Sequence, residues 1–258
     1  TTLANTAITN WESVNFTTED GLTLHGWFIP PSPESDGATF ILVHGYSANR
    51  TAMIDQATML HQAGYGVLVF DLRNHGESEG NVTTWGYLET ADVIAAFHYV
   101  QQRPDVNPNQ IGLIGKSMGG AAVIRAAARL PEAKLVVAES TYTSFADNLP
   151  VIARSMGGVP DYYAPIVLWA AERITGVPLR DVRPVADIAQ LSPRPVLIIQ
   201  GDQDGLVAPA HAEQLFAAAG QPKALYMIPG ANHLDIVTKD PEAFAERLLA
   251  FVATEIRP

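Results

Sequence analysis

The sequence predicts an α/β fold in which helices cover both faces of an open, mostly parallel sheet. Six short, uninterrupted apolar runs alternate with longer segments of helical period. Wholly apolar strands belong in a sheet covered on both faces, and repeated strand–helix–strand units give right-handed parallel crossovers. The chain has 258 residues, of which 47% are hydrophobic and 17% charged, which is enough to bury a core. We therefore expect one domain spanning residues 1–258.

The first expected element is an antiparallel hairpin over residues 11–30. Polar and apolar residues alternate over 14–17 and again over 22–29, and Glu19-Asp20-Gly21 supplies the turn between them. The six apolar runs are the remaining predicted strands, at residues 40–43, 67–70, 111–114, 135–138, 196–199 and 225–228. Helices are predicted at residues 52–63, 87–102, 119–130, 209–219 and 241–256.

One crossover is much longer than the others. More than fifty residues separate Ala138 from Val196, whereas a plain helical crossover needs about a dozen or more. This stretch is rich in proline and aromatic residues and has apolar stripes around 149–156 and 166–174. We expect a small helical cap, inserted at about residues 143–190, over the carboxyl edge of the sheet. The alternative is an ordinary pair of surface helices.

Charge and composition narrow the class of partner. Sixteen basic against 27 acidic residues give a net charge of −11, and such a chain repels phosphate backbones, so nucleic acid is not an expected partner. The absence of cysteine excludes disulfides, thiolate metal sites and a cysteine nucleophile.

Targeting signals are also missing from the sequence. No apolar stretch reaches the roughly 18 residues that span a bilayer, and no signal-peptide pattern opens the chain. Because the chain begins with Thr rather than Met, its localisation stays open: a soluble cytoplasmic domain, or one exported or anchored through a removed N-terminal segment.

A G-x-S-x-G pentapeptide, Gly115-Lys116-Ser117-Met118-Gly119, is the strongest chemical signal. It lies directly between the predicted strand 111–114 and the predicted helix 119–130. A tight strand-to-helix turn of this kind exposes its central serine at the carboxyl edge of the sheet, next to a helix N-terminus. Ser117 is therefore the candidate nucleophile, and it needs a base to take its proton.

The loops after the last two predicted strands supply the partners. His233 follows strand 225–228 and is the candidate base, while Asp202 and Asp204 follow strand 196–199 and are two candidate acids. The chain order of serine, acid and histidine differs from the orders found in chymotrypsin and subtilisin. On order and spacing alone, both carboxylates remain open.

With these motifs the chain resembles the α/β-hydrolase superfamily, in its esterase, thioesterase and prolyl-oligopeptidase-like branch. The resemblance runs from about residue 16 to residue 251. It rests on His44-Gly45-Tyr46, the segment 71–78 (Asp-Leu-Arg-Asn-His-Gly-Glu-Ser), the serine pentapeptide, the pattern Gly201-x-x-Asp204-x-x-Val207, and His233. The segment 71–78 departs from the usual D-x-R-G-x-G-x-S, since Asn74 stands in place of the first glycine after the arginine.

The resemblance implies roles for individual residues. It favours Asp204 over Asp202 as the acid that orients His233, and it places the oxyanion hole at the backbone N–H groups of Tyr46 and Met118. We expect a pocket lined by Gly45, Tyr46, Tyr142, Leu206 and Trp169. The remaining histidines, His44 and His75 among them, are expected to be structural, and Lys116 a solvated neighbour rather than a base.

The expected activity is hydrolysis of carboxylic esters with a modest apolar acyl or aryl group, through an acyl-enzyme, by a monomer acting on small molecules. No metal or cofactor is expected, because neither H-E-x-x-H nor a nucleotide-binding glycine motif occurs. The same triad would also serve a thioesterase, an amidase or peptidase, or an acyltransferase. A non-catalytic binding scaffold is the remaining alternative.

Overall fold

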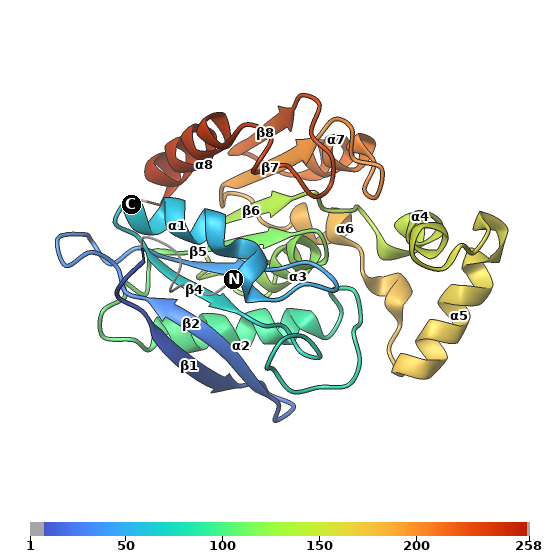
Figure 1. Cartoon of the computed structure of the whole chain (residues 1–258), viewed down its shortest axis with the longest axis horizontal. Coiled ribbons are helices and arrows are strands. Elements are labelled where there is room, and N and C mark those ends of the chain that lie inside the picture. The colour runs from blue at the N-terminus through green and yellow to red at the C-terminus, as the bar shows by residue number, and fades with distance from the viewer. Residues whose placement is uncertain (1–7, 257–258) are drawn as a thin grey trace.

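The computed structural model describes residues 8–256, and its centre is an eight-stranded sheet with the strand order β1-β2-β4-β3-β5-β6-β7-β8 (Figure 1). The strands are β1 Glu12–Thr17, β2 Thr23–Ile29, β3 Thr39–Val43, β4 Gly66–Phe70, β5 Ile111–Lys116, β6 Leu135–Glu139, β7 Val196–Gly201 and β8 Lys223–Ile228. From β4 to β8 every neighbouring pair is parallel. This confirms the predicted class, the α/β-hydrolase fold with a mostly parallel sheet.

The predicted N-terminal hairpin is confirmed. β1 and β2 pair antiparallel, with Glu12 opposite Phe28, and β2 joins the main sheet antiparallel to β4. At the turn, Gly21 has a φ of 86°, which favours glycine, and the Leu22 N–H donates to Thr18 Oγ1 at 3.0 Å. The hairpin therefore adds two strands to the sheet beyond β4, and β1 is the edge strand.

The helices are α1 Ile54–Gln62, α2 Glu89–Gln101, α3 Met118–Ala127, α4 Phe145–Gly157, α5 Ala164–Thr175, α6 Pro184–Ile188, α7 Pro209–Ala218 and α8 Pro241–Glu255. Those predicted from sequence are present, with ends shifted by at most three residues. A 3-10 turn, Arg50–Met53, precedes α1, and the short α6 was not predicted.

Two layers of helices cover the sheet, which explains the continuous apolar runs. Ile41 and Val43 of β3 pack into a cluster with residues of α2, α3 and α7. Phe40 and Leu42 point to the other face and pack with residues of α1 and α8. Because successive side chains of a strand point to opposite faces, a strand buried on both sides must be apolar at every position.

Helices α4 and α5 lie beyond the carboxyl ends of β5 and β6, at the right of Figure 1. These two helices pack on the rest of the protein through a separate apolar cluster, which includes Tyr142, Phe145, Leu149 and Leu179. In α5 the side chains that pack there are Ala164, Val167, Leu168 and Ala171, spaced as one helical face. Across residues 8–256, no helix combines the length and apolar character needed to cross a bilayer.

Candidate active site

Ser117 lies at a strained turn between β5 and α3. Its φ is 55° and its ψ −118°, a conformation that residues with a Cβ rarely adopt. The turn also requires close backbone contacts. A Cβ on Gly115 would collide with the carbonyl of Gly119, and one on Gly119 would collide with the carbonyls of Val43 and His44. Both glycines of the pentapeptide are therefore needed for the turn to form.

His233 joins Ser117 to Asp204. Its Nε2 lies 3.1 Å from Ser117 Oγ, and its Nδ1 lies 2.8 Å from Asp204 Oδ2. These residues come from three loops, each following a different strand of the sheet: β5, β7 and β8. Since Asp204 can only accept when ionised, we assign the proton of the neutral imidazole to Nδ1, which leaves Nε2 free to accept the serine proton.

Asp204 is buried but well supplied with donors. Its Oδ1 accepts the N–H groups of Leu206 at 2.9 Å and Val207 at 2.8 Å, and its Oδ2 also accepts from Gln200 Nε2 at 3.0 Å. Burial by itself raises the pKa of Asp204, but the hydrogen bond and charge of His233 together with the two N–H groups hold that pKa below its ordinary value. The carboxylate therefore stays ionised beside the imidazole.

Asp202, the other candidate acid, lies elsewhere in the same loop. Its Oδ1 accepts the Gly230 N–H at 2.7 Å, so it ties its loop to the one that carries His233. Of the two carboxylates only Asp204 hydrogen-bonds to His233.

The loop after β3 lies against Ser117. A Cβ on Gly45 would be 3.2 Å from Ser117 Cβ. Buried His44 holds this loop: its Nε2 accepts the Leu72 N–H at 3.1 Å, and its Nδ1 is 2.7 Å from the Gly45 carbonyl oxygen. Burial lowers the pKa of His44 to about 4, so Nδ1–H donates and the ring is neutral at pH 7.

The Gly45 carbonyl and the Tyr46 N–H belong to one planar peptide and point in opposite directions. By fixing the carbonyl, His44 also fixes the direction of the Tyr46 N–H. On the other side of Ser117, Met118 is the first residue of α3, where N–H groups have no intrahelical partner. Of the two expected oxyanion donors, Met118 thus directly follows Ser117 in sequence, and Tyr46 directly follows Gly45, which packs against Ser117.

A cavity of about 320 Å³ opens at Ser117 and His233. Four of the expected residues line it: Gly45, Tyr46, Tyr142 and Leu206. Sequence reasoning missed several others, among them Trp85, Asn148, Ile152, Met156 and Leu234. Trp85 stacks on Tyr46 with ring centroids 4.4 Å apart, and these two rings line the cavity. Phe145 stacks on Trp85 at 5.1 Å.

Sequence comparison agrees with this geometry. Residues 40–247 match the model of the Alpha/beta hydrolase family. The chain belongs to the alpha/beta hydrolase family. It is 34% identical to the Salmonella typhi protein YfhR over 252 residues, which cover 95% of this chain and 82% of that protein. Its similarity to the Arabidopsis thaliana alpha/beta hydrolase domain-containing protein WAV2 is 27% identity, over 94% of this chain and 78% of that protein.

The same fold occurs in solved structures. A Pyrococcus furiosus esterase superposes with a TM-score of 0.82 at 24% identity, covering 100% of this chain and 97% of the esterase chain. At this identity the likeness shows the fold alone. Membership of the alpha/beta hydrolase family supports a hydrolase.

The prediction that Trp169 lines the pocket is wrong. Trp169 is 57% exposed and is not among the residues that line the cavity. In α5 the face that packs inward is formed by Ala164, Val167, Leu168 and Ala171, and Trp169 lies outside that stripe. The Arg173 guanidinium lies over the Trp169 ring, 5.8 Å from the ring centroid.

The segment 71–78 has a left-handed residue where it departs from the family pattern. Asn74 has a φ of 59°, in the left-handed region that asparagine tolerates better than other non-glycine residues, and so it replaces the usual glycine. His75 Nδ1 lies 2.8 Å from the Arg73 carbonyl oxygen, while its Nε2 accepts the Ser47 N–H at 3.3 Å. His75 therefore connects this segment to the Tyr46 loop, a structural role as expected.

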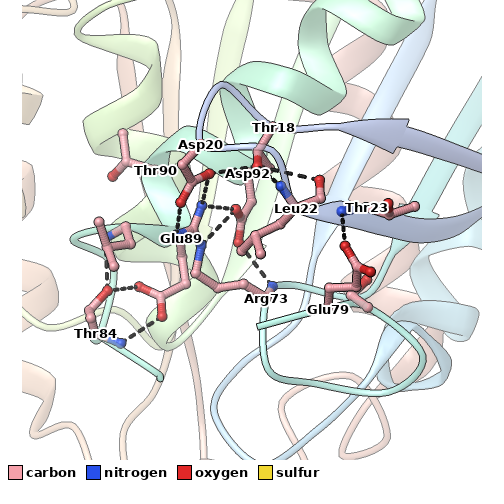
Figure 2. Close-up of polar contacts among 12 residues, drawn as sticks. Thr18, Asp20, Leu22, Thr23, Arg73, Glu79, Thr84, Glu89, Thr90 and Asp92 are labelled. Carbon is pink, nitrogen blue, oxygen red and sulfur yellow. Dashed lines mark hydrogen bonds and ion pairs between the residues drawn. The ribbon is translucent and has the colours of Figure 1, made fainter. Parts of the chain in front are cut away.

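A buried polar network holds the loop that carries Trp85 (Figure 2). Arg73 reaches Asp92 of α2 through Nε at 2.8 Å and Nη2 at 2.7 Å, and it reaches Asp20 of the hairpin turn through Nη1 at 2.8 Å. Glu89, the first residue of α2, accepts the Thr84 N–H at 2.7 Å and the Gly86 N–H at 2.8 Å. The two residues flanking Trp85 are thus both bound to one carboxylate.

Over residues 8–256, no group of three or more histidine, aspartate or glutamate side chains is arranged to hold a metal ion. At the serine turn, the Ser117 hydroxyl, the His233 imidazole and the Asp204 carboxylate form a chain of hydrogen bonds.

Proposed function

We propose that this protein is a serine esterase that cleaves carboxylic esters with a modest apolar acyl or aryl group. The observation that carries the proposal is the hydrogen-bond chain from Ser117 through His233 to Asp204 at the mouth of a largely apolar cavity. A serine hydroxyl becomes an effective nucleophile when a positioned base takes its proton. The 3.1 Å distance from Oγ to Nε2 suits that transfer.

In the first half of the reaction Ser117 Oγ attacks the ester carbonyl carbon while His233 Nε2 takes the hydroxyl proton. The C–O bond to the alcohol then breaks, and the imidazolium returns that proton to the leaving oxygen. In the second half His233 takes a proton from water while the water oxygen attacks the acyl carbon. The bond from that carbon to Ser117 Oγ then breaks, the imidazolium returns the proton to Oγ, and the acid leaves. Asp204, which is ionised, stabilises the imidazolium in both halves without taking a proton itself.

In this proposal the N–H groups of Met118 and Tyr46 stabilise the negative oxygen formed at the carbonyl. Two observations support it: Met118 is the first residue of α3, whose positive end favours an anion, and Gly45, which precedes Tyr46, packs against Ser117. A single preorganised donor of this kind stabilises a transition state by about 3–4 kcal/mol. His44, which fixes the Gly45–Tyr46 peptide, is the residue that prepares this donor before substrate arrives.

The cavity supports the substrate class. A volume of about 320 Å³ is at the lower end of the range for small-molecule sites. Its walls combine the Tyr46–Trp85 stack with aliphatic side chains of α4 and of the loops after β7 and β8. We propose that the segment of α4 and α5, residues 145–175, acts as the cap of this site, because three α4 residues line the cavity.

The decisive experiment is covalent. Incubation with a fluorophosphonate should add one label to the wild-type mass and none to Ser117→Ala, because only an activated serine attacks this phosphorus centre. Ser117→Ala should also lower kcat on p-nitrophenyl butyrate by about 10⁴-fold to 10⁶-fold. An unlabelled wild-type protein of correct fold would favour a binding scaffold and end the proposal.

The bond type is tested separately, with matched substrates. The butyryl ester, thioester and anilide should be compared under one set of conditions, with kcat/KM as the measure. The proposal expects the ester to exceed the anilide by a large factor. A thioester preferred over the ester would keep the triad and change the substrate class.

A further inference from the structure

The wall of the cavity that belongs to α4 is not uniformly apolar. Asn148, Ile152 and Met156 follow one another at intervals of four residues, which places them along one side of the helix, and all three line the cavity. Their exposure rises along the helix, from 1% at Asn148 to 54% at Met156. Asn148 is therefore a polar residue at the buried end of an apolar wall.

The Asn148 carboxamide is not used by the fold. Within residues 8–256 its Oδ1 is fully buried and has no hydrogen-bond partner. The Asn148 backbone N–H makes a helical bond to Ser144 at 3.2 Å, so the side chain is not needed to cap α4, which Ser144 Oγ caps through the Asp147 N–H. A buried polar group without a partner destabilises a protein by about 1–3 kcal/mol.

Another polar side chain of the cavity, Tyr142, is already engaged. Its hydroxyl donates to the Trp85 carbonyl oxygen at 2.6 Å, so that proton does not serve the Asn148 oxygen. Because Asn148 lines the cavity, a bound molecule can supply the missing partner once the amide is turned so that its oxygen faces the cavity. Because a carboxamide both accepts and donates, the ligand group that matches it in either orientation is a hydroxyl, which does the same.

We propose that Asn148 is a specificity residue that recognises a hydroxyl on the apolar group of the ester bound in this cavity. The substrate class is then hydroxylated aryl or alkyl esters rather than plain ones. This inference rests on the proposed esterase function, since it concerns the same site. Rejection of the plain analogue follows from the physics, because the plain group leaves the buried amide without a partner.

The test compares kcat/KM for p-nitrophenyl 3-phenylpropanoate with its meta-hydroxy and para-hydroxy counterparts. A second arm uses acetates of 3-phenylpropanol and its ring-hydroxylated counterparts, because the cavity can receive either side of the ester. In at least one arm the wild type should prefer a hydroxylated ester by about tenfold, which corresponds to about 1.4 kcal/mol. Asn148→Leu, which keeps the branched shape of the side chain without its polar atoms, should bring this ratio close to one.

Two variants guard the interpretation. Ile152→Leu lies one turn along the same wall and should change both members of a pair alike, so that their ratio stays as in the wild type. Asn148→Ala replaces Asn148→Leu if the larger side chain prevents folding, as judged by circular dichroism. Wild-type ratios near one in both arms, or a preference that survives both Asn148 variants, would overturn the proposal.

A binding measurement separates this inference from the catalytic proposal. Ser117→Ala should bind methyl 3-(hydroxyphenyl)propanoate about tenfold more tightly than methyl 3-phenylpropanoate in calorimetry, and adding Asn148→Leu should remove that difference. If the wild type hydrolyses no ester of the panel, the esterase proposal fails while this result still decides the role of Asn148. Equal affinities for the two methyl esters contradict the inference alone.

Discussion

Ser117 combines a chemical role with an unfavourable backbone. A residue with a Cβ at φ 55° and ψ −118° is strained by about 1–3 kcal/mol. The surrounding structure maintains it, since the Ser117 N–H donates to the Glu139 carbonyl at 2.7 Å and its carbonyl accepts the Ala121 N–H at 3.1 Å. The strain directs Oγ away from the sheet toward His233, so stability is given up locally for the position of one oxygen.

This strain predicts an unusual order of stability. Ser117→Gly relieves the unfavourable φ, whereas Ser117→Ala retains it, so the glycine variant should unfold at an equal or higher temperature. At an ordinary position glycine is less stable than alanine by about 0.5–1 kcal/mol. Calorimetric Tm values of the two variants measure the difference, and both should lack esterase activity. A glycine variant clearly less stable than the alanine one contradicts the strain.

The two aspartates after β7 are distinguished by what each oxygen accepts. Asp204→Asn should lower kcat by about 10³-fold to 10⁴-fold, because the amide no longer stabilises the His233 tautomer and imidazolium. Asp202→Asn is the matched control two residues away: its side-chain oxygen can still accept the Gly230 N–H, so kcat should change only a few-fold. Comparable losses in both variants would remove Asp204 from its assigned role.

At the scale of elements, the loop between β4 and α2 shows what sequence patterns do and do not predict. The strand before it and the helix after it follow from apolar runs and helical period. The position of Trp85 does not, because it depends on long-range contacts: Arg73 with Asp92 and Asp20, and Glu89 with the residues on either side of Trp85 (Figure 2). No local spacing marks such a residue as part of the cavity wall.

The same element carries a prediction. Glu89→Gln replaces an acceptor-only carboxylate that holds three donors, Thr84 N–H, Thr84 Oγ1 and Gly86 N–H, so at least one donor loses its partner. We expect a loss of about 1–3 kcal/mol in the free energy of unfolding and a raised KM as Trp85 becomes mobile. Glu79→Gln is the control, since Glu79 accepts a single exposed N–H, that of Thr23. Equal KM values for Glu89→Gln and the wild type would exclude this role.

For the whole molecule, the parallel sheet brings residues from distant parts of the chain to one edge. That Ser117, His233 and an aspartate lie at one edge was predictable, because each follows an apolar run and parallel strands end at the same edge of a sheet. The choice of Asp204 over Asp202 came from the resemblance to the family. The positions of Asn148 and Trp169 were not predictable, because each requires knowledge of which face of α4 or α5 turns inward. The prediction that Trp169 lines the pocket was wrong for that reason: the aromatic residue is present in the segment but lies on the outer face.

Burial across the same sheet gives the molecule a pH dependence centred on Glu139. Its side chain is fully buried at the end of β6, and burial raises its pKa to about 7 from the ordinary 4.5, against the opposing charge of Lys116 and the hydrogen bond from Gln56. The folded state therefore retains a proton that the unfolded state releases at lower pH. Glu139 contributes its full stability below pH 4.5 and loses it as the pH rises through 7.

Glu139→Gln removes this ionisation while keeping the shape of the side chain. Relative to the wild type, the variant should gain stability between pH 5 and pH 8, by up to about 3 kcal/mol. His44 contributes the opposite slope, because its pKa of about 4 makes its contribution full above 6.5 and decreasing as the pH falls toward 4, and it contributes equally in both proteins. Urea unfolding at pH 5 and pH 8 isolates the Glu139 effect. A stability difference between variant and wild type that is the same at both pH values would mean that Glu139 ionises in the folded protein as it does in the unfolded chain.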